Sequence, residues 1–239
     1  MANPAFSEKT FTKLDITHDE NGVMTVPTTL NKVGILLFIL LASSAVSWIG
    51  MEKQWSIAGA LIPAGLIGGF LCVLVLVFKK EWAPQLAPTY ALLEGLAIGA
   101  ISFIFHEIAL LAAGLTIGVV LVMWFLYKTK ILQATQGFIF GLTAATGAIF
   151  LIYMATWILG MFGINMPYIH DAGLIGIGFS LVVVTIAALN LIIDFHLIEQ
   201  GAAMRAPKYM EWYAAFGLMV TIIWLYLEIL KLLAKLARR

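Results

Sequence analysis

Residues 172–194, AGLIGIGFSLVVVTIAALNLIID, carry no charged side chain until their last residue, Asp194. About 20 consecutive apolar residues are enough to cross the hydrocarbon core of a bilayer as a helix. A helix suits this solvent because each of its backbone groups finds a hydrogen-bond partner within the segment. The stretch therefore predicts a membrane-spanning helix that ends at Asp194.

Six further stretches of this kind lie along the chain, and only short connections separate them. The seven predicted spans are 33–50, 57–78, 88–105, 108–127, 136–161, 172–194 and 209–231. The composition agrees, because 62% of the residues are hydrophobic and 11% are charged, against roughly 25% charged in soluble domains. We predict an all-α membrane protein with a single seven-helix domain over residues 33–239. The polar residues 1–32 predict a flexible N-terminal leader.

The basic residues predict how the spans are oriented. The leader and the connections after the second, fourth and sixth spans hold Lys9, Lys13, Lys32, Lys79, Lys80, Lys128, Lys130, Arg205 and Lys208, whereas the opposite loops hold only Lys53. Cytoplasmic loops carry the excess of Lys and Arg in membrane proteins, so the N-terminus is expected in the cytoplasm. An odd number of spans then places the basic C-terminal tail on the opposite side, against the same rule.

Several functional classes find no support in the sequence. The formal net charge of +1 gives no basic field for nucleic acid, and the single Cys72 cannot form an internal disulfide. His106 and Glu107 lack the second histidine of a zinc-binding HExxH helix, and no GxSxG nucleophile motif is present. We therefore expect a protein that is not an enzyme, needs no cofactor, and has the lipid bilayer as its main partner.

Glycines recur four residues apart in four of the predicted spans. The pairs are Gly65/Gly69, Gly95/Gly99, Gly114/Gly118 and Gly137/Gly141. Such pairs let helix backbones approach closely in a membrane, so each pair is expected to pack against a neighbouring helix. The spacing alone leaves the oligomeric state open.

Four carboxylates fall within the predicted spans, where a charge costs about 2.5–3.5 kcal/mol on insertion scales. Glu94 either lines a pore or hydrogen-bonds a neighbouring helix. Glu211 opens the last span after Pro207, where it suits helix capping. Glu228 precedes Lys231 by three residues, the spacing of a helical ion pair, although a functional role stays open.

Asp194 is the fourth of these acids and the strongest functional candidate. The predicted C-terminal end of a helix disfavours an anion, and burial does the same. A protonated Asp194 could donate a hydrogen bond, whereas an ionised one would seek water or a cation, so the group could act as a proton-operated latch. The alternative is an interfacial carboxylate paired with Arg205 or Lys208.

Three motifs resemble those of the Bax inhibitor-1 (YccA-like, transmembrane Bax-inhibitor-motif) proteins, in a bacterial branch. They are LNLIIDFHLIEQG at 189–201, YALLEGLAIGAIS at 90–102 and WLYLEILKLL at 224–233. Together with seven short-looped helices, the resemblance covers about residues 30–235. It implies a location in the bacterial inner (plasma) membrane.

The resemblance also implies a pH-sensitive calcium leak channel. In that family two aspartates are thought to share a proton and close a pore. Asp194 matches the first of them and is a possible transient contact for the permeant cation. Thr221 stands where the second is expected. We rank Glu211 first and Glu228 second as the acid that would replace it.

A second hypothesis comes from a different class of function. The mixed charge of the leader would allow it to fold on binding another protein. The chain would then be a non-conducting membrane adaptor or regulator, with a membrane protease or another membrane protein as its partner.

Overall fold

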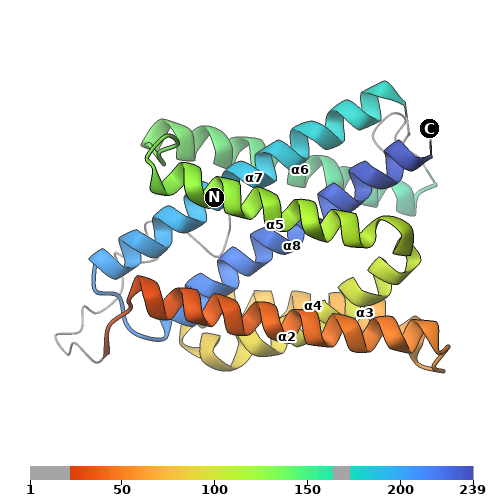
Figure 1. The fold of residues 1–239 in the computed structure, drawn as a ribbon, viewed down its shortest axis with the longest axis horizontal. Helices are drawn as coiled ribbons and strands as arrows, with labels where there is room; N and C mark the ends of the chain where they lie inside the picture. The colour runs from red at the N-terminus through yellow and green to blue at the C-terminus, as the bar shows by residue number, and fades with distance from the viewer. Residues whose placement is uncertain (1–21, 164–172, 239) are drawn as a thin grey trace. The chain divides into compact units, whose positions relative to one another are not determined.

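The structure is a computed structural model that describes residues 22–163 and 173–238. Its seven long helices are α2 (Val26–Glu52), α3 (Ala58–Phe78), α4 (Ala83–Ile104), α5 (His106–Lys128), α6 (Gln136–Met161), α7 (Leu174–Ala203) and α8 (Met210–Ala237), and the short 3-10 turn η2 (Lys80–Trp82) precedes α4 (Figure 1). All seven are long and apolar enough to cross a membrane. The predicted all-α fold with seven spans is confirmed, and the chain is a multi-pass membrane protein.

The first helix begins earlier than predicted, so residues 26–32 do not belong to a flexible leader. Thr25 caps α2, because its hydroxyl accepts a hydrogen bond from the Thr28 amide at 3.4 Å. Pro27 lies in the first turn, where its fixed φ suits a helix and its missing N–H is not needed. This start signal lies upstream of the apolar stretch. The remainder of the predicted leader, residues 1–21, lies outside the described residues.

Helix α7 runs past its predicted end, to Ala203. Residues 195–203 contain no proline, and their only weak helix former is Gly201, so nothing stops the helix after Asp194. The helix ends where Arg205 adopts a φ of 53° and the Ala206 amide donates to the Gly201 carbonyl at 3.0 Å. The prediction that Asp194 stands at a helix C-terminus is therefore wrong, and the argument from the helix dipole does not apply to it.

The chain divides into two compact units, to which α7 and α8 each contribute a segment. Of the described residues, the α2–α4 unit comprises 22–106 and 196–220, and the α5–α6 unit comprises 107–163, 173–195 and 221–238.

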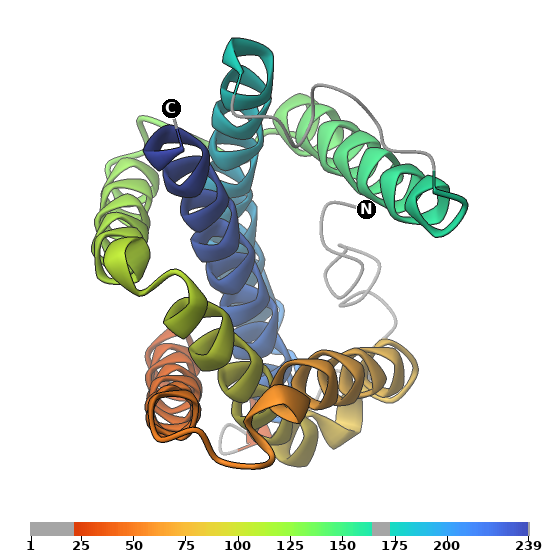
Figure 2. The ribbon, with the colours of Figure 1, turned by 90° about the vertical axis from the view of Figure 1, so that its right-hand side faces the viewer.

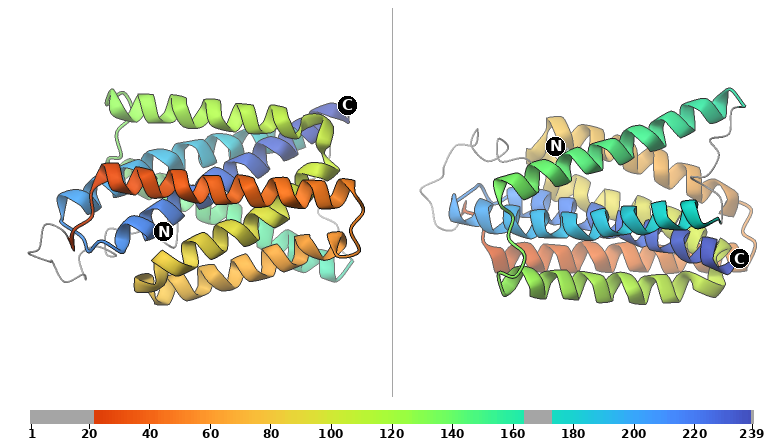
Figure 3. Two further views of the ribbon diagram at one scale, coloured as in Figure 1. Left: turned by 60° about the horizontal axis from the view of Figure 1, so that its bottom comes forward. Right: turned by 90° about the horizontal axis from the view of Figure 1, so that it is seen from above.

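In the α2–α4 unit, α4 packs against both α2 and α3 (Figure 3). A Cβ atom added to Gly95 would lie 2.5 Å from the Leu40 carbonyl oxygen, and one added to Gly99 would lie 2.7 Å from the Ser44 Cα. The Ser44 hydroxyl also donates to the Gly95 carbonyl at 2.9 Å. The expected close approach at Gly95/Gly99 is confirmed.

Of the other three glycine pairs, one packs closely against a neighbouring helix and two meet no described atom within 4 Å. A Cβ atom on Gly65 would lie 2.5 Å from the Leu93 carbonyl oxygen, and Gly69 faces Glu94, so this pair also packs against α4. In contrast, no described atom lies within 4 Å of a Cβ added at the remaining two pairs, which are Gly114/Gly118 and Gly137/Gly141. For these two pairs the packing prediction is wrong, because spacing does not reveal which face of a helix is covered.

In the α5–α6 unit, polar side chains join α7 to its neighbours. Asn190 donates from Nδ2 to the Thr146 hydroxyl of α6 at 2.9 Å. Near the end of α8, the Lys235 ammonium donates to the Gly176 carbonyl at 3.0 Å and to the Ser180 hydroxyl at 2.9 Å. Figure 2 shows these last turns of α8, in dark blue, beside α7.

Candidate gating site

Asp194 lies on the buried face of α7, where the residue is 2% exposed. A side-chain hydrogen bond links its carboxyl group to the Thr221 hydroxyl of α8. Its Oδ2 atom is buried and has no hydrogen-bond partner among the described residues, so the bond to Thr221 uses the other oxygen. The structure therefore joins Asp194 of α7 to Thr221 of α8.

The surroundings of Asp194 limit what this carboxyl can do. None of the interactions seen for Asp194 within the described part of its own unit involves a charged side chain. The alternative pairing with Arg205 or Lys208, which belong to the other unit, stays a prediction. The described residues also contain no group of three His, Cys, Asp or Glu side chains that could hold a metal ion. Burying an ionised, unpaired oxygen is costly.

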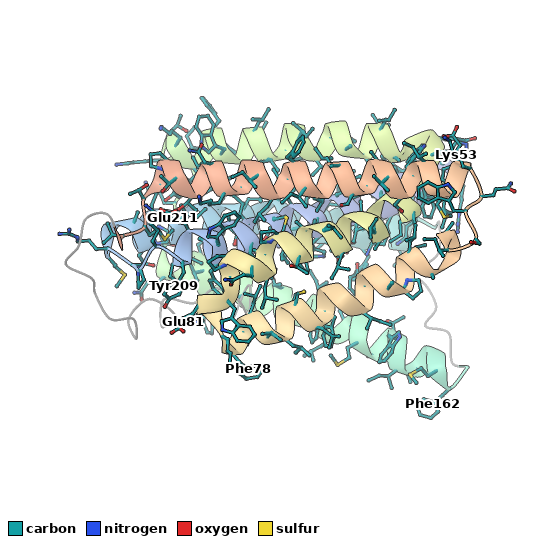
Figure 4. The ribbon with its side chains drawn as sticks, turned by 90° about the horizontal axis from the view of Figure 1, so that it is seen from below. Lys53, Phe78, Glu81, Phe162, Tyr209 and Glu211 are labelled. Carbon is teal, nitrogen blue, oxygen red and sulfur yellow. The ribbon has the colours of Figure 1, made fainter. Side chains whose placement is uncertain are left out.

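Glu211, at the start of α8, is fully buried and belongs to the α2–α4 unit. Its Oε1 atom accepts hydrogen bonds from the Thr25 amide, at 3.3 Å, and from the Thr28 hydroxyl. Figure 4 places Glu211 beside the N-terminal end of α2, opposite the end that carries Lys53. Since α2 has no acidic residue in its own first turn, the Oε1 atom of Glu211 caps this helix N-terminus from α8. The Oε2 atom of Glu211, like Oδ2 of Asp194, is buried without a partner among the described residues.

Glu211 was ranked first as the partner of Asp194; the two residues belong to different units of the chain, so this pairing stays a prediction. The hydrogen bonds of Glu211 go to α2, whereas that of Asp194 goes to Thr221. The backbone next to Glu211 is also joined to the start of the described chain. The Met24 amide donates to the Ala206 carbonyl at 2.7 Å, and the Lys208 amide donates to the Gly22 carbonyl at 2.8 Å.

Replacing Glu211 by Gln is expected to destabilise the α2–α4 unit by about 1 kcal/mol, since the helix cap that its carboxyl group forms with Thr25 and Thr28 is weakened. The unfolding midpoint in detergent should fall by about 2–4 °C. Cys72 is the only cysteine and is buried in the same unit, so a thiol-reactive dye reports its exposure on heating. Glu81→Gln removes an exposed acid of this unit and should leave the midpoint unchanged. Equal midpoints for both variants would contradict this role of Glu211.

Glu228 is 1% exposed and lies on α8 in the α5–α6 unit. Its Oε1 atom accepts from the Lys231 ammonium at 2.6 Å and from the Trp224 indole N–H at 3.1 Å. Its Oε2 atom accepts from the Tyr153 hydroxyl of α6 at 3.0 Å. The expected Glu228–Lys231 ion pair is confirmed, and the second-ranked pairing of Asp194 with Glu228 is not observed.

These positions can be compared with those of known proteins. The sequence pattern of the family described as Bax inhibitor 1 like matches residues 3–238. The chain belongs to this family. No curated protein and no solved structure matches it. The match confirms the resemblance inferred from the sequence, and it covers every span of this Bax inhibitor 1 like protein, including Asp194, Thr221 and Glu228.

Glu94 of this Bax inhibitor 1 like chain lies on α4, in the α2–α4 unit, and is 8% exposed. Its Oε2 atom would lie 2.6 Å from a Cβ atom added to Gly69 of α3, so the absence of a side chain at Gly69 makes room for the carboxyl. The hydrogen bond expected from Glu94 to a neighbouring helix is not seen among the described residues. Glu94 is a packed acid of the α3–α4 contact.

Sequence reasoning missed two partners of Glu228. Trp224 stands four residues before it on the same helix face, a spacing that could have indicated the contact. Tyr153 is 75 residues away in the chain, and no local pattern points to it.

Proposed function

We propose that this Bax inhibitor 1 like protein is a pH-sensitive cation leak, with Ca²⁺ as the expected permeant ion and Asp194 as the gating group. The observation that supports this proposal best is the buried Oδ2 atom of Asp194, which has no partner among the described residues. A carboxyl oxygen in that position is stable when the group carries a proton. Once the proton is lost, the oxygen attracts water or a cation.

The two protonation states hold α7 and α8 together differently. At low pH, neutral Asp194 can donate a hydrogen bond to Thr221, and this bond holds the two helices together in the α5–α6 unit. At high pH, ionised Asp194 still accepts the Thr221 hydrogen bond, but its buried, unpartnered Oδ2 atom now shares the negative charge and draws a hydrated cation in between the helices. Because a threonine does not titrate in this range, the switch releases one proton rather than the two of a carboxyl pair.

The proposal includes a location and an orientation. The chain resides in the bacterial inner membrane with its N-terminus in the cytoplasm, as the distribution of basic residues favours. It acts without a cofactor and without enzymatic chemistry, since transport down a gradient requires neither.

Reconstitution into vesicles that contain a calcium-sensitive dye tests this function. Ca²⁺ entry should exceed that of empty vesicles and should rise with pH, because deprotonation opens the gate. The rise from 10% to 90% should span about two pH units, as for a single titrating group. Flux equal to that of empty vesicles at every pH would contradict the proposal. It would favour the adaptor, whose expected contact segment is the leader predicted over residues 1–32, of which 1–21 lie outside the described residues.

A further inference from the structure

Four side chains of the α5–α6 unit form a cluster, which we call the Glu228 cluster. Its members are Tyr153 of α6 with Trp224, Glu228 and Lys231 of α8. Besides its 2.6 Å ion pair with Glu228, the Lys231 ammonium donates to the Tyr153 hydroxyl at 3.3 Å and lies 4.5 Å from the centre of that ring. The ammonium is therefore held between two oxygen atoms from different helices.

The two charges of this cluster differ in their access to the surroundings. The Glu228 side chain is 2% exposed, whereas that of Lys231 is 46% exposed. A long lysine side chain can keep its ammonium at an exposed position while its stem stays packed. Lys231 can therefore leave the cluster by rotating its side chain, but Glu228 cannot follow it.

The carboxylate keeps partners when Lys231 leaves. The Tyr153 hydroxyl donates a hydrogen bond to Oε2 of Glu228, and the Trp224 indole N–H donates one to Oε1. Hydrogen bonds to the charged form of a carboxyl favour that form. The next basic side chain on α8, Lys235, is bonded to Gly176 and Ser180 of α7. Departure of Lys231 thus leaves an anion in place with a vacant position beside it.

We propose that Glu228 and Tyr153 form a second cation site, which the Lys231 ammonium occupies as a tethered competitor. A small hydrated cation takes the same position when the Lys231 side chain rotates outward. Hard cations such as Ca²⁺ prefer carboxylate and other oxygen ligands and complete their shell with water. One carboxylate and one phenol oxygen provide weak binding, which suits an ion that must leave again. The inference rests on the proposed function in one respect, namely that the ion bound here is the ion that permeates and that Asp194 contacts.

Terbium luminescence tests the site without any need for flux. Tb³⁺ binds where Ca²⁺ does, and it emits when a nearby indole is excited, so Trp224 serves as the reporter. In purified full-length protein, Lys231→Met should bind Tb³⁺ about tenfold more tightly than the wild type, a gain of about 1.4 kcal/mol. Lys231→Arg keeps the tethered charge and should behave as the wild type. The double variant Lys231→Met with Glu228→Gln should lose the gain.

Two results would overturn the inference. Emission from Lys231→Met that equals that of Lys231→Arg would show that the ammonium does not compete for a site. A gain that survives Glu228→Gln would place the ion elsewhere. An unchanged thermal unfolding curve, followed by the helical circular dichroism of the whole protein, confirms that each variant is folded, and Lys231→Gln replaces Lys231→Met if the latter is not. Terbium binding by a protein that passes no Ca²⁺ would refute the leak and leave this site standing.

Discussion

Asp194→Asn is expected to make the Ca²⁺ flux independent of pH and to hold it at the low level of the acidic wild type. The asparagine side chain has nearly the same shape as a protonated aspartate, and it can still hydrogen-bond the Thr221 hydroxyl. It cannot ionise, so the contact between α7 and α8 stays in the form that closes the gate. The vesicle and dye measurement described above follows the flux from acidic to alkaline pH.

The effect should be large at alkaline pH, where wild-type Asp194 is ionised. A difference of about 1.4 kcal/mol between the open and closed forms corresponds to a tenfold change in flux. Glu107→Gln is the matched control, because it removes an exposed carboxylate at the start of α5 and should leave the pH profile unchanged. If the pH dependence of the Ca²⁺ flux is the same in Asp194→Asn, in Glu107→Gln and in the wild type, Asp194 is not the gating group.

The number and approximate places of the helices follow from the sequence because lipid imposes a length on every apolar stretch. The ends follow less well. Apolar residues define the part of a helix that crosses the hydrocarbon, whereas caps and breakers define where the helix stops. Thr25 and Pro27 start α2 before the apolar stretch, and Arg205 ends α7 well after Asp194. Asp194 therefore lies inside α7, on its buried face and well before the helix ends at Ala203.

The site was predictable only where its members are neighbours on one helix. The Glu228–Lys231 pair has a separation of three residues, and its geometry follows from the turn of the helix. Glu211 finds its partners 183 and 186 residues away, at the start of α2. Such contacts depend on how the helices pack in the α2–α4 unit. Residue types alone do not reveal them, so no pattern in the sequence indicates that Glu211 caps α2.

The glycine pairs show the same limit in the packing of the spans. All four pairs have one spacing, yet only the pairs on α3 and α4 meet a neighbouring backbone among the described residues. Ser44 and Ser47 of α2 complete the contact with α4, since their hydroxyls donate to the carbonyls of Gly95 and Leu96 at 2.9 and 2.6 Å. At the contact of α4 with α2, close approach therefore coincides with serines on the facing helix, which the glycine pattern by itself does not contain.

Gly99→Ala is consequently expected to destabilise the α2–α4 unit by about 2 kcal/mol, within the range for overpacking a dense contact. The new methyl group would collide with the Ser44 backbone, which cannot rotate away as a side chain could, so α2 must shift and strain its bonds to α4. The unfolding midpoint, followed by dye labelling of Cys72 in detergent, should fall by about 4–8 °C.

Gly34→Ala provides the matched control within the same unit. Gly34 lies inside α2, and a Cβ atom there meets no described atom within 4 Å. Alanine is the better helix former by about 1 kcal/mol, so this variant should melt at the wild-type temperature or above it. If Gly99→Ala lowers the unfolding midpoint and Gly34→Ala raises it, the effect of packing is separated from the effect of helix propensity. A midpoint for Gly99→Ala as high as that for Gly34→Ala would mean that α2 and α4 are not in backbone contact at Gly99.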